Sequence, residues 1–289
     1  MSVDDIQGDS LIVTGGYRSV GNYCVIGHPV AQSMSPTLFA AWFADLELGF
    51  RYVALDIPQD ELVLRAPALP FEYSGINVTA PLKTSILGFV DAIDADAEAV
   101  GAANLLYRDK ETKAWTAGNV DGAGFVAGFE EATGAPLFGR DVLILGAGGA
   151  ARSIAVSVAQ QRPNSIVIGN RTPQGAIELA DRVGATQALS LGPNIIERCD
   201  EVPDLVINTL PPAAETFFAG LQIDALQDQA ILLDINYHVS RPGLLARGAE
   251  RGLMSLDGRP MFLWQAALSF ERWFGVKPNM DVGRDVLGI

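Results

Sequence analysis

The sequence predicts an α/β protein built from two units. In the first third of the chain, short apolar stretches alternate with a helical stretch, which is the strand–helix–strand order of α/β folds. The same order begins again near Asp141, where a new apolar stretch is followed by a helical one. With 289 residues, 49% of them hydrophobic, the chain can bury the core of one large domain or of two medium ones.

The first unit is expected to begin with a strand over 23–27, which is apolar as far as its closing glycine. A helix is expected over 36–48, because Ser35 suits the N-cap and Pro36 suits the first helical position. A second strand over 51–55 follows this helix and completes one strand–helix–strand repeat.

The strand expected over 74–79 is largely apolar but contains Asn77 and Thr79. Pro81 ends it, and Lys83 follows. A fully buried strand favours Val and Ile throughout, so an amide, a hydroxyl and an ammonium at the end of one strand need another reason. These groups either cap a turn at the surface or line a pocket, and the strand alone leaves both interpretations open.

The second unit is expected to place a helix over 154–160 between its first two strands. Near the end of the chain, an amphipathic helix with aromatic residues on one face is expected over 262–274. The strands expected in this unit are the short apolar runs over 141–145, 165–168, 204–208 and 230–234.

A glycine-rich motif follows the strand over 141–145 and precedes the helix, with the spacing Gly146-x-Gly148-x-x-Ala151. Gly146 would allow a tight turn, Gly148 would let the backbone approach a pyrophosphate, and Ala151 would keep helix and strand close. This placement favours a Rossmann dinucleotide site over a purely structural glycine turn. The loop residues expected to bind the cofactor are Gly146, Ala147, Gly148, Gly149 and Ala150.

The residues after the strand over 165–168 indicate which dinucleotide binds. An NAD site usually has Asp or Glu here to hold the ribose 2′-hydroxyl, but this chain has Asn170, Arg171 and Thr172. A guanidinium attracts a 2′-phosphate and can bind it in a forked geometry. The sequence therefore predicts NADP, with NAD as the second choice; the alternative is that Arg171 is an ordinary surface residue.

The segment over 27–36 connects a strand to a helix and carries two hydroxyls, Ser33 and Ser35. Backbone amides at a helix N-terminus, together with hydroxyls, can hold a carboxylate without any cation. The alternative is plain helix capping by Ser35, which would be the simpler explanation if this motif stood alone.

Several motifs, in this order along most of the chain, resemble those of the shikimate and quinate dehydrogenase family. They are GHPVAQSMSP, NVTAPLK, GAAN, NVDG, GAGGAAR, NRT and the closing DGRPMFLWQAALSFERWFG. The resemblance implies a two-domain fold, in which an α/β substrate domain is built from both chain ends and a Rossmann dinucleotide-binding domain is inserted between them. The implied boundaries are 1–122 plus 256–289 for the substrate domain and 123–255 for the cofactor domain.

The same resemblance implies roles for individual residues. Lys83 and Asp121 would be the catalytic acid–base pair, while Gly258 and Met261 would lie near the nicotinamide. The substrate, a cyclohexene carboxylate, would be held by Ser33, Ser35, Asn77, Thr79, Asn104, Tyr237 and Gln265.

The implied activity is the NADP-dependent interconversion of 3-dehydroshikimate and shikimate, a step of aromatic amino acid biosynthesis. Quinate or aminoshikimate dehydrogenase activity and a cofactor-binding regulator without turnover are the alternatives. The chain departs from the family pattern where Leu105 and Val120 replace threonines and where Gly175 replaces a second basic residue. None of these departures removes an expected catalytic group.

Composition restricts the partners and the setting. A net charge of −14 and a pI near 4.5 argue against nucleic acid or an anionic membrane as a partner. Cys24 and Cys199 form no paired motif and are expected to be free thiols in a reducing cytoplasm, and His28 and His238 are too few for a His-rich metal site. The first residues lack a signal-peptide profile, no metal is expected, and a monomer or a homodimer is expected.

Overall fold

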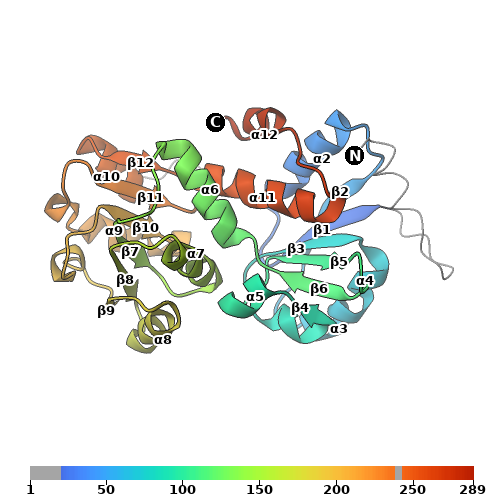
Figure 1. The fold of residues 1–289 in the computed structure, drawn as a ribbon, viewed down its shortest axis with the longest axis horizontal. Helices are drawn as coiled ribbons and strands as arrows, with labels where there is room; N and C mark the ends of the chain where they lie inside the picture. Colours follow the sequence, from blue (N-terminus) through green and yellow to red (C-terminus); the bar gives the residue numbers. More distant parts are fainter. Residues whose placement is uncertain (1–20, 238–242) are drawn as a thin grey trace. The chain divides into compact units, whose positions relative to one another are not determined.

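The structure, a computed structural model, describes residues 21–237 and 243–289 (Figure 1). The sequence-based expectations for residues 1–20 and for His238 lie outside the described residues.

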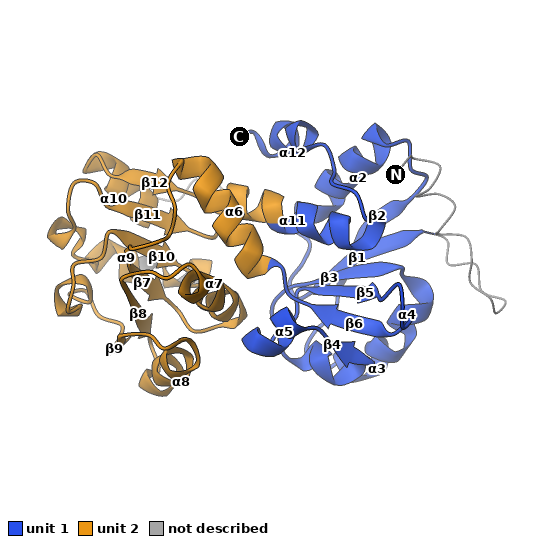
Figure 2. Cartoon of the chain, viewed as in Figure 1, with its two compact units in different colours: residues 1–120, 265–289 blue, residues 121–264 orange. Residues whose placement is uncertain are grey.

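The chain divides into two compact units, Met1–Val120 with Gln265–Ile289 (unit 1) and Asp121–Trp264 (unit 2), as Figure 2 shows. Unit 2 is one continuous stretch, whereas unit 1 takes its residues from both ends of the sequence. One division falls at the start of helix α6 (Asp121–Thr133) and the other falls inside helix α11 (Arg259–Phe274). The functional boundaries expected at 122/123 and 255/256 stay a prediction.

Unit 1 contains a six-stranded mixed sheet in the order β2-β1-β3-β5-β6-β4. Strands β2, β1 and β3 run parallel, β5 pairs antiparallel with both β3 and β6, and β4 runs parallel to β6. The strands are β1 (Asn22–Gly27), β2 (Arg51–Asp56), β3 (Gly75–Val78), β4 (Ala92–Ile93), β5 (Leu105–Arg108) and β6 (Trp115–Gly118).

Aromatic side chains from helix α2 (Ser35–Asp45) and from α11 pack on one face of this sheet. Phe39 stacks on Tyr52 with ring centroids 4.4 Å apart, and Trp273 lies 4.9 Å from Tyr23. Helix α12 (Met280–Leu287) follows α11, and the Trp42 indole donates to the carbonyl of Asn279 just before it (2.8 Å). The remaining α-helices among the described residues of unit 1 are α3 (Leu62–Arg65), α4 (Leu69–Glu72) and α5 (Ala95–Val100).

The start of α2 corrects one sequence-based expectation. Ser35 is the first helical residue and not the N-cap, because Met34 before it already has helical φ and ψ angles of −81° and −6°. The Ser35 amide donates a hydrogen bond to the Ser33 hydroxyl (3.3 Å). The helix also ends at Asp45, three residues before the expected end, 48.

Unit 2 contains a six-stranded, fully parallel sheet in the order β12-β11-β10-β7-β8-β9, which confirms the predicted α/β class. Its strands are β7 (Asp141–Leu145), β8 (Ser165–Asn170), β9 (Gln187–Ser190), β10 (Leu205–Asn208), β11 (Ile231–Asp234) and β12 (Met254–Leu256). Its further helices are α7 (Gly149–Gln160), α8 (Pro173–Val183), α9 (Glu215–Gly220) and α10 (Leu244–Glu250).

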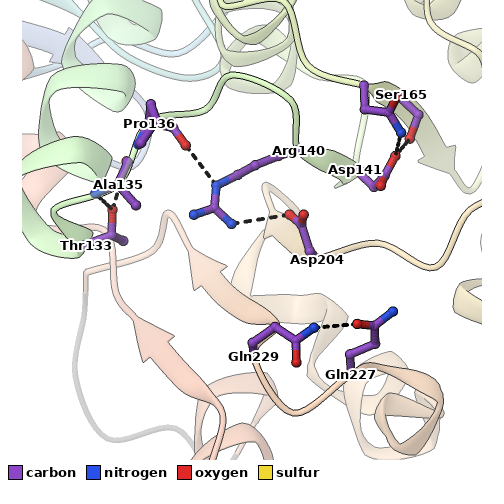
Figure 3. Close-up of polar contacts among 10 residues, drawn as sticks. Thr133, Ala135, Pro136, Arg140, Asp141, Ser165, Asp204, Gln227 and Gln229 are labelled. Carbon is purple, nitrogen blue, oxygen red and sulfur yellow. Dashed lines mark hydrogen bonds and ion pairs between the residues drawn. The ribbon is translucent and has the colours of Figure 1, made fainter.

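The unit 2 strands are continuous apolar runs because both faces of the sheet are buried. Ile144 and Ile207 belong to the core cluster that includes Phe125 and Phe129 of α6, whereas Leu143 and Val206 belong to the cluster on the other face. At the amino ends of the strands, the Arg140 guanidinium joins Asp204 (3.3 Å) and the Pro136 carbonyl (2.9 Å), as Figure 3 shows. In open α/β sheets, ligands bind at the carboxyl ends of the strands, so a site is expected at the opposite edge of this sheet.

Candidate functional site

In unit 1, the loops that follow β1 and β3 lie side by side at the carboxyl ends of these parallel strands. The Thr79 amide donates to the carbonyl of Ile26 (2.8 Å), and the His28 amide donates to that of Ala80 (3.0 Å). A Cβ atom on Gly27 would lie 2.4 Å from the Thr79 methyl group, so a glycine is needed where the two loops meet. The half-buried Thr79 therefore stands at the base of the loop that carries the two serines.

Ser33 and Ser35 lie at the beginning of α2. Ser33 is half-buried and Ser35 is buried, with the Ser33 hydroxyl on the Ser35 amide. The Asp56 carboxylate at the end of β2 holds the loop between β1 and α2. It accepts a hydrogen bond from the Val30 amide (3.2 Å) and pairs with the His28 ring (3.0 Å). The loop that carries the expected carboxylate-binding hydroxyls is thus tied to the neighbouring strand.

Three of the expected substrate-binding amides gather in unit 1. The Asn104 side chain accepts from the Val120 amide (2.8 Å) and donates to the Gln265 side chain (3.5 Å). The Asn77 amide, which is 6% exposed, donates to the Asn104 carbonyl (3.2 Å). Residues far apart in sequence therefore form one hydrogen-bonded group at the start of β5.

Lys83 and Asp121, the two expected catalytic residues, belong to different segments of the chain. Half-buried Lys83 lies in the turn after β3, where its carbonyl accepts from the Ala103 amide (2.7 Å). Asp121, 5% exposed, opens α6 directly after Val120, whose amide Asn104 holds. Lys83 belongs to unit 1 and Asp121 to unit 2, and their action as a catalytic pair stays a prediction.

The glycine motif of unit 2 has the backbone that a dinucleotide loop requires. Gly146 has a φ angle of +117°, and a Cβ atom there would lie 2.2 Å from the Thr209 hydroxyl, so only glycine fits. Gly148 is exposed with open space where its Cβ would be, and it caps α7 without a side-chain hydrogen bond. The N-cap residue Gly148 therefore offers no side-chain acceptor to the first N–H groups of α7, at Gly149 and Ala150.

The segment after β8 is held in a defined shape by Asn170. Its side-chain amide donates to the Thr172 hydroxyl (2.9 Å) and carbonyl (3.1 Å). Gly175 packs against this amide, since a Cβ there would lie 2.8 Å from the Asn170 Nδ2 atom. Arg171 between them is exposed, and in the part of the chain that the structure describes its guanidinium has no ion-pair partner.

Two glycines fix the segment that carries Met261. A Cβ on Gly258 would lie 1.9 Å from the carbonyl oxygen of Ile235, and one on Gly128 of α6 would lie 2.7 Å from the Met261 amide nitrogen. The Tyr237 ring packs on Phe262 with centroids 4.5 Å apart. The expected cofactor-side residues Gly258 and Met261 thus belong to unit 2 and are tightly positioned there.

The sequence reasoning missed three residues of these arrangements: Tyr52, Gly128 and Ser269. Tyr52 and Ser269 both contact the Asn77 side chain. Ser269 had a usable signal, since it is a polar residue four positions after Gln265 on a helix rich in aromatic residues. Tyr52 had none, because a tyrosine in a strand is ordinary.

The two departures at threonine positions prove to be neighbours. Leu105 and Val120 are both buried and lie in one hydrophobic cluster with Tyr107, against Leu268 and Trp273. Two apolar side chains that pack together therefore occupy these positions.

Among residues 21–237 and 243–289, no helix is both long and apolar enough to cross a membrane. The same residues include no group of three or more His, Cys, Asp or Glu side chains that could hold a metal ion.

Three family models match the chain in sequence order. The shikimate dehydrogenase substrate binding domain matches residues 25–106, and the shikimate / quinate 5-dehydrogenase model matches residues 131–218. The shikimate 5′-dehydrogenase C-terminal domain matches residues 258–287.

Similar proteins cover nearly the whole chain. The shikimate dehydrogenase (NADP(+)) of Bacillus licheniformis is 37% identical over 92% of this chain and 95% of that protein. The shikimate 5-dehydrogenase of Thermus thermophilus, solved with NADP(H) and shikimate, has a TM-score of 0.79 at 30% identity, over 93% of this chain and 98% of that one. The Listeria monocytogenes shikimate 5-dehydrogenase, solved with shikimate and NAD, has a TM-score of 0.81 at 27% identity, over 95% and 99%.

Proposed function

The chain belongs to the shikimate dehydrogenase family, and from this premise we propose that it interconverts shikimate and 3-dehydroshikimate by hydride transfer with NADP. The observation that carries the proposal is the group of neutral hydrogen-bonding side chains in unit 1 at the carboxyl ends of β1 and β3. Amides and hydroxyls of this kind suit the hydroxyl groups on the substrate ring, since each can donate and accept.

In the proposed substrate complex, Thr79, Asn104 and Gln265 hold the ring hydroxyls. Ser33 and Ser35 at the start of α2 bind the carboxylate, and Tyr237 is assigned to the same group of the substrate. Asn77 supports these substrate-binding side chains through its own contacts, because both hydrogens of its amide are donated to protein atoms. A carboxylate held by hydroxyls and a helix N-terminus needs no buried cation.

The unit 2 residues fit NADP. The Gly146 turn and the open space at Gly148 leave the backbone accessible to a pyrophosphate, which the first N–H groups of α7 can bind. The exposed Arg171 at the end of β8 supplies a cation where an NAD site would have a carboxylate. Asn170 and Thr172 hold the segment beside it, and Gly258 and Met261 form the nicotinamide end.

Bound cofactor would supply the hydride in its reduced form or accept it in its oxidised form, and the proton would be left to the protein. Reduction of the ring ketone creates an alkoxide, to which the Lys83 ammonium donates a hydrogen bond and then its proton. Asp121 orients Lys83 and the reacting hydroxyl. In the oxidative direction the same pair takes the proton from the hydroxyl.

One spectrophotometric screen tests the proposal. Shikimate, quinate and aminoshikimate are each offered with NADP and with NAD, and the absorbance of the reduced nicotinamide is followed, with the Lys83→Ala protein as background. We expect shikimate with NADP to give the highest kcat/KM. Higher values with quinate or aminoshikimate would assign the enzyme to a relative of the same family. Binding of NADP without turnover of any of the three would instead favour a regulator.

The setting and assembly complete the proposal. We place the reaction in the cytoplasm because Cys24 and Cys199 are both free thiols, as a reducing compartment requires. We expect a monomer or a homodimer, which light scattering of the purified protein distinguishes.

A further inference from the structure

A buried polar group at the centre of unit 1 is built around Asn77. Its Oδ1 accepts from the Tyr52 hydroxyl (2.8 Å), and its Nδ2 donates to the Ser269 hydroxyl (2.9 Å) and to the Asn104 carbonyl (3.2 Å). These partners come from three other elements: β2, α11 and the start of β5. A buried amide with both ends engaged is costly to disturb, since each unpaired polar atom keeps its desolvation penalty.

The orientation of the Asn77 amide follows from its partners. The Asn104 carbonyl can only accept a hydrogen bond, so the nitrogen of the Asn77 side chain must face it. The oxygen then faces Tyr52, whose hydroxyl must donate. Tyr52 is held in place by the ring of Phe39, which stacks on it at an interplanar angle of 11°. The Asn104 carbonyl therefore sets which way the amide points, and the Tyr52 hydroxyl is the donor that satisfies the amide oxygen.

Asn77 connects to two of the proposed substrate-binding residues, directly to Asn104 and through Ser269 to Gln265. The carbonyl of Asn104 that it contacts also accepts from the Val78 amide (2.8 Å), so this bond helps to fix the backbone from which the Asn104 side chain extends. The Ser269 hydroxyl that it contacts donates to the carbonyl of Gln265 (2.9 Å), one helical turn earlier on α11. The side chains of Asn104 and Gln265 then meet each other (3.5 Å).

We propose that Tyr52 is a positioning residue for substrate binding, which acts through Asn77 and Ser269 to hold Asn104 and Gln265 at the correct separation. Tyr52 itself does not touch the substrate in this proposal. The proposal rests on the function proposed above, because it assigns Asn104 and Gln265 to the ring hydroxyls. It predicts that loss of the Tyr52 hydroxyl weakens substrate affinity, while the chemical step and cofactor binding keep their rates and affinities.

The test compares two buried tyrosines of the same sheet. Tyr52→Phe keeps the ring on Phe39 and removes only the hydroxyl. Tyr107→Phe is the matched control, since this phenol is also buried but its hydroxyl donates to Asp94 (3.3 Å), outside the Asn77 group. Both variants remove the hydroxyl of a buried tyrosine, so a general loss of stability should appear in both. Circular dichroism and thermal unfolding establish that each is folded.

For Tyr52→Phe we expect the KM for shikimate to rise at least about fivefold with kcat and the KM for NADP within about twofold, as loss of one buried hydrogen bond predicts. Tyr107→Phe should keep the parent KM for shikimate. Ser269→Ala should reproduce the rise, and the double variant with Tyr52→Phe should show less than the product of the two effects because both act on Asn77. A full product in the double variant, or equal KM changes in Tyr52→Phe and Tyr107→Phe, would overturn the proposal.

Hydrogen exchange tests the positioning without any turnover. The amides of Val78 and Val120 donate to the backbone and the side chain of Asn104, and we expect both to exchange roughly fivefold faster in Tyr52→Phe but not in Tyr107→Phe. If the exchange rates of these two amides are unchanged in Tyr52→Phe, Tyr52 is not a positioning residue, whatever the substrate is. If the parent protein does not turn over shikimate but the exchange pattern appears, the proposed function fails while the control of Asn104 by Tyr52 stands.

Discussion

Lys83 and Asp121 carry the proton in the proposed reaction, so substitutions at these two residues should separate chemistry from binding. Lys83→Ala should lower kcat at least about 100-fold, the usual scale for loss of a general acid–base group, and should change the dissociation constant for shikimate much less. Asp121→Asn should also lose turnover. Stopped-flow kinetics and equilibrium titration measure the two quantities. Near-normal turnover in either folded variant would contradict the pair.

Arg171 is the residue on which the cofactor preference is expected to depend. One forked, exposed guanidinium–phosphate contact supplies on the order of 2 kcal/mol, which corresponds to about a 30-fold preference for NADP over NAD. Arg171→Ala should therefore cut kcat/KM for NADP and leave that for NAD within a few-fold. The assignment is wrong if both cofactors lose equally, or if the parent enzyme favours NAD at fixed ionic strength.

At the scale of single residues, the sequence predicted positions whose backbone leaves little choice. Gly146 follows a strand and precedes a helix, and its positive φ angle is what the motif requires. The N-cap at Ser35 was wrong by one residue, because the turn before it already places Met34 in the helical region. Tyr52 could not be found in advance, since its role depends on contact with Asn77, 25 positions later in the chain.

Among the elements, the close approach of α6 to the beginning of α11 offers a test. A Cβ on Gly128 would lie 2.7 Å from both the Pro260 carbonyl carbon and the Met261 nitrogen, and backbone atoms cannot move aside cheaply. Gly128→Ala should therefore lower the free energy of unfolding by roughly 1–3 kcal/mol, the scale of overpacking, and should raise the KM for NADP. Urea unfolding and steady-state kinetics measure the two effects.

The control for this prediction is Gly220→Ala in the same unit. Its nearest neighbour, the Pro193 ring, would lie 3.9 Å from the added Cβ, which is an ordinary contact. The variant should match the parent in both measurements. Equal stability of the two alanine variants would show that the approach of α6 to α11 is not tight.

The strands that are continuous apolar runs could be predicted from the sequence, and β4 and β6 could not. The strands β7, β8, β10 and β11 are apolar runs between turn signals, and each agrees with its expected range within a residue or two. β4 has only two residues, and β6 (Trp-Thr-Ala-Gly) is not a continuous apolar run, so neither carries a signal that distinguishes a strand. Asn77 is a polar residue in the otherwise apolar β3, and this exception indicated either a surface turn or a pocket at the end of the strand.

For the molecule as a whole, three weakly acidic side chains predict a loss of stability in alkali. Burial raises the pKa of the Cys199 thiol from 9.0 to about 11, and burial also raises the pKa values of Cys24 and Tyr23. Between about pH 9 and 11 the unfolded chain therefore binds fewer protons than the folded chain, so the free energy of unfolding falls as pH rises. Urea titrations at several pH values measure it.

The Cys199→Ala variant isolates one part of this effect. Removal of the thiol should make the fall of the free energy of unfolding with rising pH less steep. Near neutral pH this free energy should depend on pH in the same way in the parent and the variant. A parent stability that stays constant up to pH 11 would contradict the raised pKa values.

The family and the α/β class could be predicted from the order of the motifs, because these depend on local spacing. What the sequence could not supply is the partner of each buried polar group. Asn77 and Gln265 lie far apart in the chain, and only the folded sheet of unit 1 brings them into one hydrogen-bonded group through Ser269.

The split composition of unit 1 has a consequence for synthesis on the ribosome. The first 120 residues emerge early, but Phe270, Trp273 and Phe274, which pack on Tyr23, Phe39 and Phe43, are translated only near the end. Until then Tyr23, Phe39 and Phe43 lack these aromatic partners, while the continuous unit 2 already has all its strands. A premature stop codon just after Trp264 would leave unit 2 complete and unit 1 exposed as a target for chaperones and proteases.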